Sequence, residues 1–300
     1  MRFSVRAPAS SANLGPGFDA LGIALDLWNT IDIETGGEGI SVRYVGVDAI
    51  GMEGHENYSV RAMRLTAEEY RRDLPNFRLT AQIDVPVARG LGSSAAAIVA
   101  GLLAANHLLE LDLSDDHLFQ AAARMEGHGD NVGAALHGGA ILSVPGLGRA
   151  VRLGSGLNLD LTTVVFIPDV HGATWVALAE LPQRVALADA AFNVGAAGGI
   201  IAGLLTGDVP AIAAGMHDRL HEPPRSRLYP HLIPMSEAAR AAGAIGACLS
   251  GAGPAVLALV TPDRAPGVCQ AMGEAGQRAG IAGRCQHLPI SPQGAHVLPG

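Results

Sequence analysis

Pro86-Val-Ala-Arg-Gly-Leu-Gly-Ser-Ser-Ala-Ala96 is the most distinctive segment of this 300-residue chain. It follows residues 77–85, whose alternation of apolar and polar side chains predicts a half-buried strand. It leads into residues 95–111, which are rich in Ala and Leu and predict a helix. The stretch is therefore a glycine-rich loop between a strand and the first turn of a helix.

This loop has the composition of an anion-binding site. Gly90 and Gly92 would let the backbone approach a ligand without a Cβ in the way, and Ser93 and Ser94 are expected at the helix N-cap. Exposed N–H groups and the positive end of the helix dipole attract phosphate there, and the hydroxyls offer hydrogen bonds or ligands for Mg²⁺. A glycine turn before a capped helix is the alternative that needs no ligand. Two glycines and two serines beside the helix start favour phosphate.

A dinucleotide site is a second interpretation of the same loop. Residues 90–95 match the fingerprint G-x-G-x-x-A, and so do residues 15–20. After the match at 15–20 the sequence alternates like a strand, whereas the fingerprint requires a helix there. In the match at 90–95, four residues separate the strand from the glycines, where the dinucleotide fold turns tightly. A dinucleotide-dependent oxidoreductase is therefore an alternative of a different class.

The basic residues narrow the chemistry, because all twenty are Arg and the chain has no Lys. A Walker A loop, a Schiff-base lysine and a kinase-type lysine–glutamate pair are thus excluded. Phosphate must be held by backbone N–H groups, hydroxyls, Arg or a metal ion. Twenty-eight acidic residues give a net charge of −8, so we expect neither nucleic acid nor a membrane surface as a partner.

Three cysteines without a zinc-binding spacing indicate a reducing compartment, and the first residues lack the apolar run of a signal peptide. The most apolar stretch, residues 185–205, is long enough to cross a membrane. It contains Asp189, Asn193 and several glycines, so we predict a buried helix instead. The chain is expected to be cytoplasmic.

Strands and helices alternate without the even spacing of a doubly wound sheet, which favours an α+β fold over α/β. The length exceeds one typical domain. Residues 146–156 contain several glycines and little periodicity. We therefore predict a nucleotide-binding domain over 1–155 and a second domain over 156–300.

Three further segments carry polar residues among glycines. Residues 8–19 place Asn13 and Asp19 in a glycine-proline loop, which as an isolated feature is explained by an Asx turn. Residues 126–131, Glu-Gly-His-Gly-Asp-Asn, offer a carboxylate for Mg²⁺ and donors for a polar substrate; the alternative is a helix C-cap followed by a turn. Residues 249–255, Leu-Ser-Gly-Ala-Gly-Pro-Ala, form a small-residue loop that a tight turn would also explain.

Together and in order, these segments resemble the GHMP kinase superfamily, which includes galactokinase, mevalonate kinase and homoserine kinase. Residues 86–96 match its phosphate motif, and residues 249–255 resemble its third motif. Residues 11–19 and 126–131 look like the homoserine kinase branch. The resemblance implies an N-terminal domain like ribosomal protein S5, a ferredoxin-like C-terminal domain, ATP and Mg²⁺, and a homodimer. It implies transfer of the γ-phosphoryl group of ATP to homoserine or a related small hydroxyl compound.

The resemblance also assigns roles to individual residues. Ser94 and Glu126 would hold Mg²⁺. Asn13, Asp19 and Arg225 would serve catalysis and substrate binding, Arg225 at the substrate carboxylate. The remaining substrate-binding residues would be His128, Asn131 and Thr174. The ATP phosphates would be held by residues of the glycine-serine loop: Pro86, Arg89, Gly90, Leu91, Gly92, Ser93, Ser94 and Ala95.

One position departs from the family pattern. In the family, a threonine is followed four residues later by an arginine at the substrate; here Thr174 is followed by Leu178. Loss of one charge-assisted donor costs roughly 1.5–3 kcal/mol. Three explanations are open: Arg184 or Arg227 takes its place, the hydroxyl substrate differs, or the protein is a weak or silent binding relative.

Overall fold

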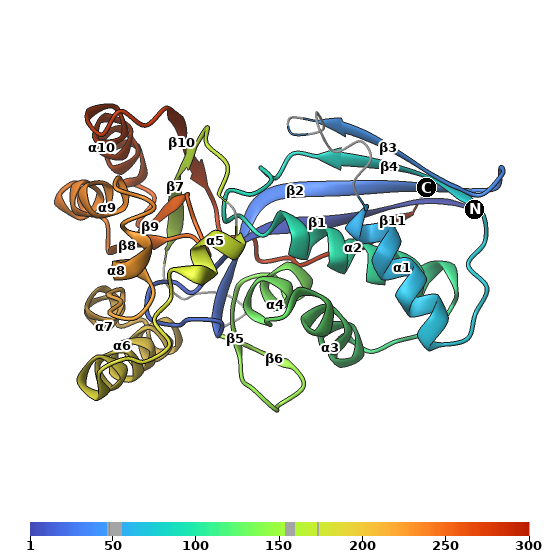
Figure 1. Cartoon of the computed structure of the whole chain (residues 1–300), viewed down its shortest axis with the longest axis horizontal. Coiled ribbons are helices and arrows are strands. Elements are labelled where there is room, and N and C mark those ends of the chain that lie inside the picture. Colours follow the sequence, from blue (N-terminus) through green and yellow to red (C-terminus); the bar gives the residue numbers. More distant parts are fainter. Residues whose placement is uncertain (47, 49–55, 154–159, 173, 300) are drawn as a thin grey trace.

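A computed structural model describes residues 1–46, 48, 56–153, 160–172 and 174–299, except for the side chains of Thr174 and Pro299. Two sheets, each covered by helices, stand side by side along the long axis of the molecule (Figure 1). This arrangement confirms the predicted α+β fold.

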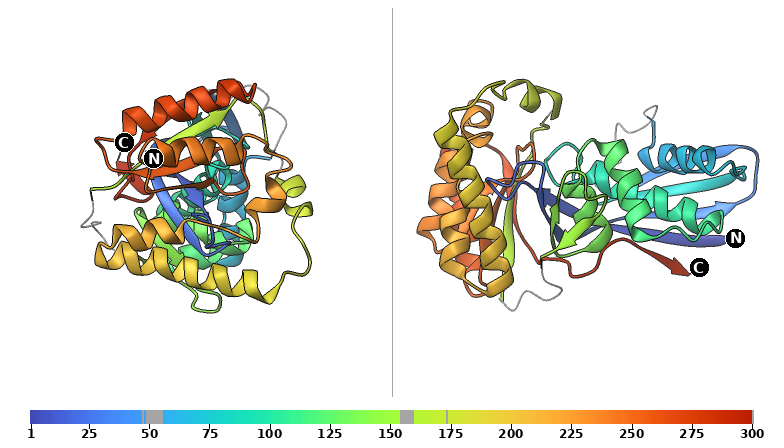
Figure 2. Two further views of the ribbon diagram at one scale, coloured as in Figure 1. Left: turned by 90° about the vertical axis from the view of Figure 1, so that its left-hand side faces the viewer. Right: turned by 90° about the horizontal axis from the view of Figure 1, so that it is seen from below.

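The larger sheet has the strand order β11-β1-β2-β4-β3, with β5 paired to β2 and β6 paired to β5. Only β3 and β4 are parallel among these pairs. Strand β11 comes from the end of the chain and pairs antiparallel with β1 at its start. Both termini therefore lie at the same end of this sheet (Figure 2). The strands are β1 (Arg2–Ala12), β2 (Leu21–Thr35), β3 (Ile40–Gly46), β4 (Phe77–Ile83), β5 (Ala140–Ser143), β6 (Ala150–Arg152) and β11 (His296–Pro299).

Helices α1 (Tyr58–Glu69), α2 (Ser93–Leu108), α3 (Asp115–Glu126) and α4 (Asp130–His137) form a layer on this sheet. On α2, Ala96, Ala100 and Ala104 recur every four residues and pack in one buried cluster with Phe3 and Phe77 of the sheet. Small alanine side chains let the helix lie close to the strands. As a result, the first turn of α2 reaches the loops at one end of the sheet.

The smaller sheet has the order β10-β7-β9-β8 and is antiparallel throughout. Its central strand β7 is buried on both faces: Val164 and Phe166 pack toward α9 and α10, whereas Val165 and Ile167 pack toward α6 and α7. The elements are β7 (Thr162–Pro168), β8 (Gly246–Leu249), β9 (Val256–Val260), β10 (Gly283–Leu288), α5 (Thr174–Ala179), α6 (Leu187–Thr206), α7 (Val209–Gly215), α8 (Glu222–Arg225), α9 (Leu232–Ala241) and α10 (Ala265–Arg278).

The prediction that residues 185–205 form a buried helix is only half right. They form α6, but just 28% of its most apolar window is buried. Its exposed stripe contains no charged residue: it consists of Leu187, Ala188, Ala191, Val194, Gly195, Gly198, Ala202, Leu205 and Thr206. The helix uses its other face to pack on α7 and the smaller sheet. Asp189, Asn193 and the glycines, which argued against a membrane span, therefore did not imply full burial of the helix. Within the described residues, α6 is also the one helix long and apolar enough to span a membrane, a weak indication taken alone.

The predicted domain boundary, between residues 155 and 156, lies within residues 154–159, which are outside the described part, so it stays a prediction. Strands β1 to β6 precede it and β7 to β10 follow it. Strand β11 also follows it in sequence but pairs with β1, with Phe3 opposite Pro299 and Arg6 opposite His296. The chain thus returns to the first sheet after building the second.

Candidate active site

The four loops singled out by sequence meet at the junction of the two sheets and hydrogen-bond to one another. The amide of Ser10 donates to Leu91 O at 3.0 Å, and the amide of Gly251 donates to Ala12 O at 3.2 Å. The hydroxyl of Ser10 donates to Asn131 Oδ1 at 2.9 Å. Segments far apart in the sequence are therefore held to each other by direct hydrogen bonds.

The glycine-serine loop ends differently from the prediction, because Gly92, not a serine, is the N-cap of α2. Gly92 has a left-handed conformation with φ 68°, and no side chain caps the helix. Ser93 and Ser94 are consequently the first two residues of α2. Their hydroxyls do not close the helix end: that of Ser93 accepts a hydrogen bond from Asn29 Nδ2 at 3.4 Å, and that of Ser94 donates one to Glu126. Both residues line the cavity at the first turn of the helix, whose N–H groups have no partner within the helix.

The glycines also serve a purpose that the sequence did not reveal. A Cβ on Gly90 would collide with the carbonyl oxygen of Ser250, and one on Gly92 would collide with the hydroxyl of Ser10. Both glycines have positive φ, 77° and 68°. They are needed because the loops pack on each other, and not only because a ligand approaches the backbone.

Arg89 was predicted to contact the phosphates, but its guanidinium is engaged elsewhere. It donates to Pro168 O at 2.8 Å, Val87 O at 2.8 Å and Asp169 O at 2.9 Å. The side chain is buried and ties the loop to the end of β7. Ala95 is fully buried within α2. Any contribution of these two residues to phosphate binding must therefore come from the backbone.

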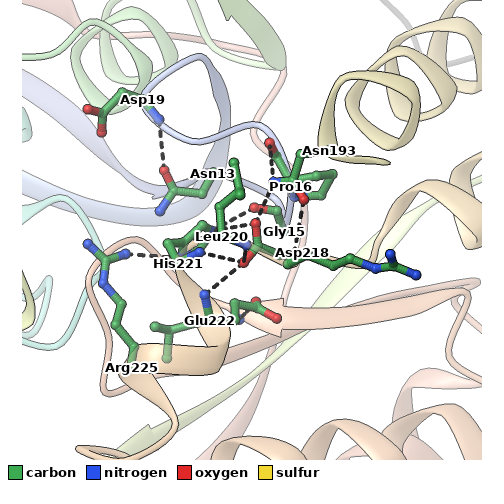
Figure 3. Close-up of polar contacts among 12 residues, drawn as sticks. Asn13, Gly15, Pro16, Asp19, Asn193, Asp218, Leu220, His221, Glu222 and Arg225 are labelled. Carbon is green, nitrogen blue, oxygen red and sulfur yellow. Dashed lines mark hydrogen bonds and ion pairs between the residues drawn. The ribbon is translucent and has the colours of Figure 1, made fainter. Parts of the chain in front are cut away.

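The loop after β1 holds Asn13 and Asp19 in left-handed conformations, with φ 72° and 55°. Asn and Asp tolerate this conformation better than most residues. The side chain of Asn13 accepts a hydrogen bond from the amide of Asp19 at 3.0 Å and donates one to Gly251 O at 3.0 Å. The bond to Asp19 spans six residues, whereas an Asx turn spans two, so Asn13 does not form the Asx turn of the alternative interpretation. The carboxylate of Asp19 points away from Asn13 (Figure 3). Burial, with the charge of Asp130, raises the pKa of that carboxyl, although His128 and Arg225 oppose the shift.

The segment 126–131 connects two helices. Gly127 ends α3 in a left-handed conformation, φ 96°, as the C-cap alternative proposed, but Asp130 then begins α4 instead of a turn. The hydroxyl of Ser94 donates to Glu126 Oε1 at 2.6 Å, which brings together the two predicted metal ligands. Asn131 is buried in the first turn of α4.

His128 forms a close pair with Asp130. Its Nδ1 lies 2.5 Å from Asp130 Oδ1. Burial lowers the pKa of this imidazole, but the hydrogen bond and charge of Asp130, with Glu126 and Asp19, outweigh it and raise the pKa to about 9. The ring is therefore a cation at neutral pH.

Substituting Asp130→Asn is expected to lower the pKa of His128, because the charged hydrogen-bond partner is lost while the imidazole stays buried. In the folded protein the pKa of His128 lies above the ordinary histidine value of 6.5. The stabilisation of the fold by the His128–Asp130 pair is therefore complete below pH 6.5 and is lost as the pH rises toward about 9. The Asp130→Asn variant should not show this loss of stability between pH 6.5 and about 9. Histidine titration by NMR and unfolding at several pH values measure both effects. Asp115→Asn, beside His137, is the matched control; an unchanged pKa of His128 in Asp130→Asn would contradict the assignment.

Arg225 is the sole arginine that lines the cavity within the described part of the chain. Its guanidinium donates to Gly251 O at 3.3 Å and to Ala177 O at 3.3 Å. Leu178 also lines the cavity and is half exposed. Arg227 is mostly exposed and pairs with Glu180 at 4.0 Å, and Arg184 is exposed, so neither takes the place of the missing arginine at this wall. Thr174 begins α5, but its side chain lies outside the described residues.

A single cavity of about 530 Å³ joins these groups. One end is polar, with Asn13, Asp19, Glu126 and Arg225. The other end is more apolar and was not predicted, because its residues come from separate elements without a shared motif. These residues include Ile31 of β2, Tyr44 of β3, Tyr58 of α1, Ile83 of β4 and Val87. The volume is that of an ordinary ligand site.

Two family models match the chain: the GHMP kinases N terminal domain over residues 57–139 and the GHMP kinases C terminal domain over residues 200–278. The fold and the site thus define a small-molecule kinase, and the chain belongs to the GHMP kinase family.

Individual relatives narrow the comparison to one kind of kinase within the family. The homoserine kinase of Synechococcus sp. strain CC9605 is 40% identical over 300 residues, covering 98% of this chain and 95% of the relative. That of Synechococcus sp. strain PCC 6301 is 39% identical, covering 99% and 98%. The crystal structure of homoserine kinase from Cytophaga hutchinsonii matches with a TM-score of 0.88 at 30% identity, covering 99% of this chain and 97% of that one. The resemblance found from the motifs is confirmed, and the oxidoreductase alternative is displaced.

Proposed function

We propose that this protein transfers the γ-phosphoryl group of ATP to the hydroxyl of L-homoserine, as a cytoplasmic enzyme. The observation that carries the proposal is the meeting of four loops around one cavity. The glycine-serine loop and the start of α2 line it beside Glu126, and Asn13, Asp19 and Arg225 line its polar end. The homoserine kinases to which the chain is similar support the choice of substrate.

ATP would lie along the cavity. The apolar end, with Tyr44, Tyr58 and Val87, suits a purine ring, and residues 90–94 would hold the phosphates through backbone N–H groups and hydroxyls. Because the chain has no lysine, phosphate must be held by backbone N–H groups, hydroxyls, Arg or a metal ion, and this loop offers the first two. Pro86 begins the turn into it, and Arg89 holds the loop to β7.

Ser94 and Glu126 fit a magnesium ion, because a hydroxyl and a carboxylate 2.6 Å apart offer the oxygen ligands that Mg²⁺ prefers. Mg²⁺ bound there would neutralise charge on the phosphates. Few protein ligands suffice, since this ion is typically held by one or two carboxylates together with phosphate oxygens and water.

Homoserine would occupy the polar end. Arg225 would pair with its carboxylate, and Asn13, Asp19 and Asn131 would hold its amino and hydroxyl groups. His128, as an imidazolium, adds positive charge nearby. Thr174 would complete the binding residues, as the family resemblance implies.

The chemical step requires positioning more than covalent chemistry. The hydroxyl oxygen forms a bond to the γ-phosphorus, the bond from that phosphorus to the bridging oxygen breaks, and ADP leaves. The hydroxyl proton needs an acceptor within reach. The carboxylate of Asp19, with its raised pKa, is suited to take it.

The test is a coupled assay of ADP release with homoserine, threonine and other small amino alcohols, each with MgATP. Homoserine should give the highest kcat/KM. A higher value for another alcohol would favour a related kinase, and tight ATP binding without turnover of any of them would indicate a silent relative.

Leu178→Arg tests the departure from the family. Leu178 faces the cavity that holds Arg225, so a second guanidinium there should lower the KM for homoserine about tenfold, the size of one charge-assisted hydrogen bond. Leu178→Met, which keeps the wall apolar, should leave KM nearly unchanged. If the arginine variant shows no gain, homoserine is bound in another way or is not the substrate.

We also propose a homodimer, which the exposed stripe of α6 supports. Gly195 and Gly198 leave open space at their Cβ positions, and the neighbouring Val194 is 76% exposed, so another helix could approach closely. Sedimentation should give twice the 30.7 kDa of one chain. Val194→Glu should yield monomers, whereas Ile233→Glu, at an exposed apolar residue of α9, should not. A monomeric wild type would contradict the proposal.

A further inference from the structure

A buried polar network lies behind Arg225 and is not part of the cavity wall (Figure 3). The carboxylate oxygen Oδ2 of Asp218 accepts three hydrogen bonds. They come from the backbone amides of Leu220, His221 and Glu222, at 3.0, 2.7 and 2.7 Å. Oδ1 of Asp218 accepts a hydrogen bond from Nδ2 of Asn193 at 2.6 Å. Asp218 thereby fixes the start of α8, from which both His221 and Arg225 project.

His221 stands between two groups of opposite hydrogen-bonding character. Its Nε2 lies 2.7 Å from Gly15 O, and its Nδ1 lies 3.1 Å from Nη1 of Arg225. A carbonyl oxygen can only accept and a guanidinium can only donate. The ring must therefore carry its proton on Nε2 and present the lone pair of Nδ1 to Arg225.

The surroundings maintain this neutral tautomer. The imidazole is 1% exposed. Burial lowers the pKa of His221 and Arg225 lowers it further, against the opposing effects of Asp218 and the bond to Gly15. A second proton on Nδ1 would point at the guanidinium. As a neutral ring, His221 can bond to both neighbours at once.

The two bonds join the two halves of the proposed homoserine site. Gly15 belongs to the loop that carries Asn13 and Asp19, next to the larger sheet. Arg225 ends α8, beside the smaller sheet. The guanidinium also lies 5.5 Å from the ring centroid of Phe18, in the same loop. His221 thus spans the distance between the groups for the amino and hydroxyl ends and the group for the carboxylate.

We infer that His221 is a positioning residue: through Nδ1 it aims Arg225 at the substrate carboxylate, and through Nε2 it keeps that arginine in register with the Asn13–Asp19 loop. The inference rests on the proposed function, since it takes Arg225 to be the carboxylate ligand. It predicts that the identity of the side chain at 221 controls recognition of the carboxylate and not the use of ATP.

Two amide variants separate the two bonds. The oxygen of Asn in His221→Asn can occupy the position of Nδ1 and accept from Arg225, whereas the amide nitrogen of Gln in His221→Gln can occupy the position of Nε2 and donate to Gly15. We expect His221→Gln to reduce kcat/KM for homoserine about tenfold to a hundredfold, the size of a lost charge-assisted bond. The loss in His221→Asn should be several times smaller. The KM for ATP should change less than twofold in both.

The decisive comparison uses 3-aminopropan-1-ol, which is homoserine without its carboxylate. Wild type and His221→Gln should phosphorylate it equally slowly, because Arg225 then has no partner to bind. An equal loss on both alcohols, or an equal loss in the two variants, would mean that His221 only supports the fold and would overturn the inference.

Arg225→Ala, assayed in parallel, separates the inference from the proposed function. If Arg225→Ala does not lower kcat/KM for homoserine more than it lowers kcat/KM for 3-aminopropan-1-ol, the proposed role of Arg225 fails. If it does and His221→Gln does not, only the inference fails. The ¹⁵N shifts of the histidine rings in the wild-type protein give a measurement that needs no variant: a ring at 221 protonated on both nitrogens, or on Nδ1 alone, would also overturn it.

Discussion

Glu126→Gln should lower kcat about a hundredfold or more, since losing one group that stabilises developing charge commonly costs a factor of 10²–10³. The amide keeps the size of the side chain and can still accept from the hydroxyl of Ser94, so the fold should be preserved. It carries no charge to hold Mg²⁺. The apparent affinity for Mg²⁺ should fall together with kcat, whereas homoserine binding should change little.

The measurement is the rate of ADP release as a function of free Mg²⁺. High Mg²⁺ should restore part of the activity of Glu126→Gln if the carboxylate holds the ion, and none if the residue has only a structural role. Glu69→Gln is the matched control, because Glu69 is an exposed carboxylate on α1 that pairs with Arg124 at 3.3 Å. Normal magnesium dependence in Glu126→Gln would refute the assigned metal site.

Gly90→Ala should both destabilise the protein and impair ATP binding. The φ of 77° is left-handed, which costs a residue with a Cβ about 1–2 kcal/mol. The new methyl group would also press on the carbonyl oxygen of Ser250, a backbone atom that cannot rotate away. Overpacking of this kind costs about 1–3 kcal/mol, so a total near 3 kcal/mol is expected.

Urea unfolding and ATP titration test this prediction. Gly273→Ala is the control: Gly273 lies in α10, nothing is within 4 Å of its Cβ position, and alanine favours a helix. It should be neutral or slightly stabilising. If Gly90→Ala unfolds at the same urea concentration as wild type and binds ATP normally, the loop does not pack on residues 250–253 as described.

The sequence located all four loops of the site, because glycines, serines and carboxylates occur there at spacings that a packed core would not select. It placed α2 within a few residues, because residues 95–111 are rich in Ala and Leu, which favour a helix. It did not find α4, because Asp130 to His137 begins directly after a glycine segment and contains a further glycine. The exposed stripe of α6 was also missed, since hydropathy alone does not indicate which apolar residues a neighbour covers.

The glycine-serine loop by itself predicts an anion site, and the lack of lysine in the chain leaves backbone N–H groups, hydroxyls, Arg or a metal ion to hold the anion. Only the folded chain shows what surrounds that loop. The tertiary structure made Gly92 the cap of α2, turned Arg89 away to β7, and brought Glu126 to Ser94 and Arg225 to Asp19's end of the cavity. These contacts join residues 30 to 200 or more positions apart. Local sequence sets backbone conformation, but only the packing of two sheets on one another determines which distant side chains share a cavity.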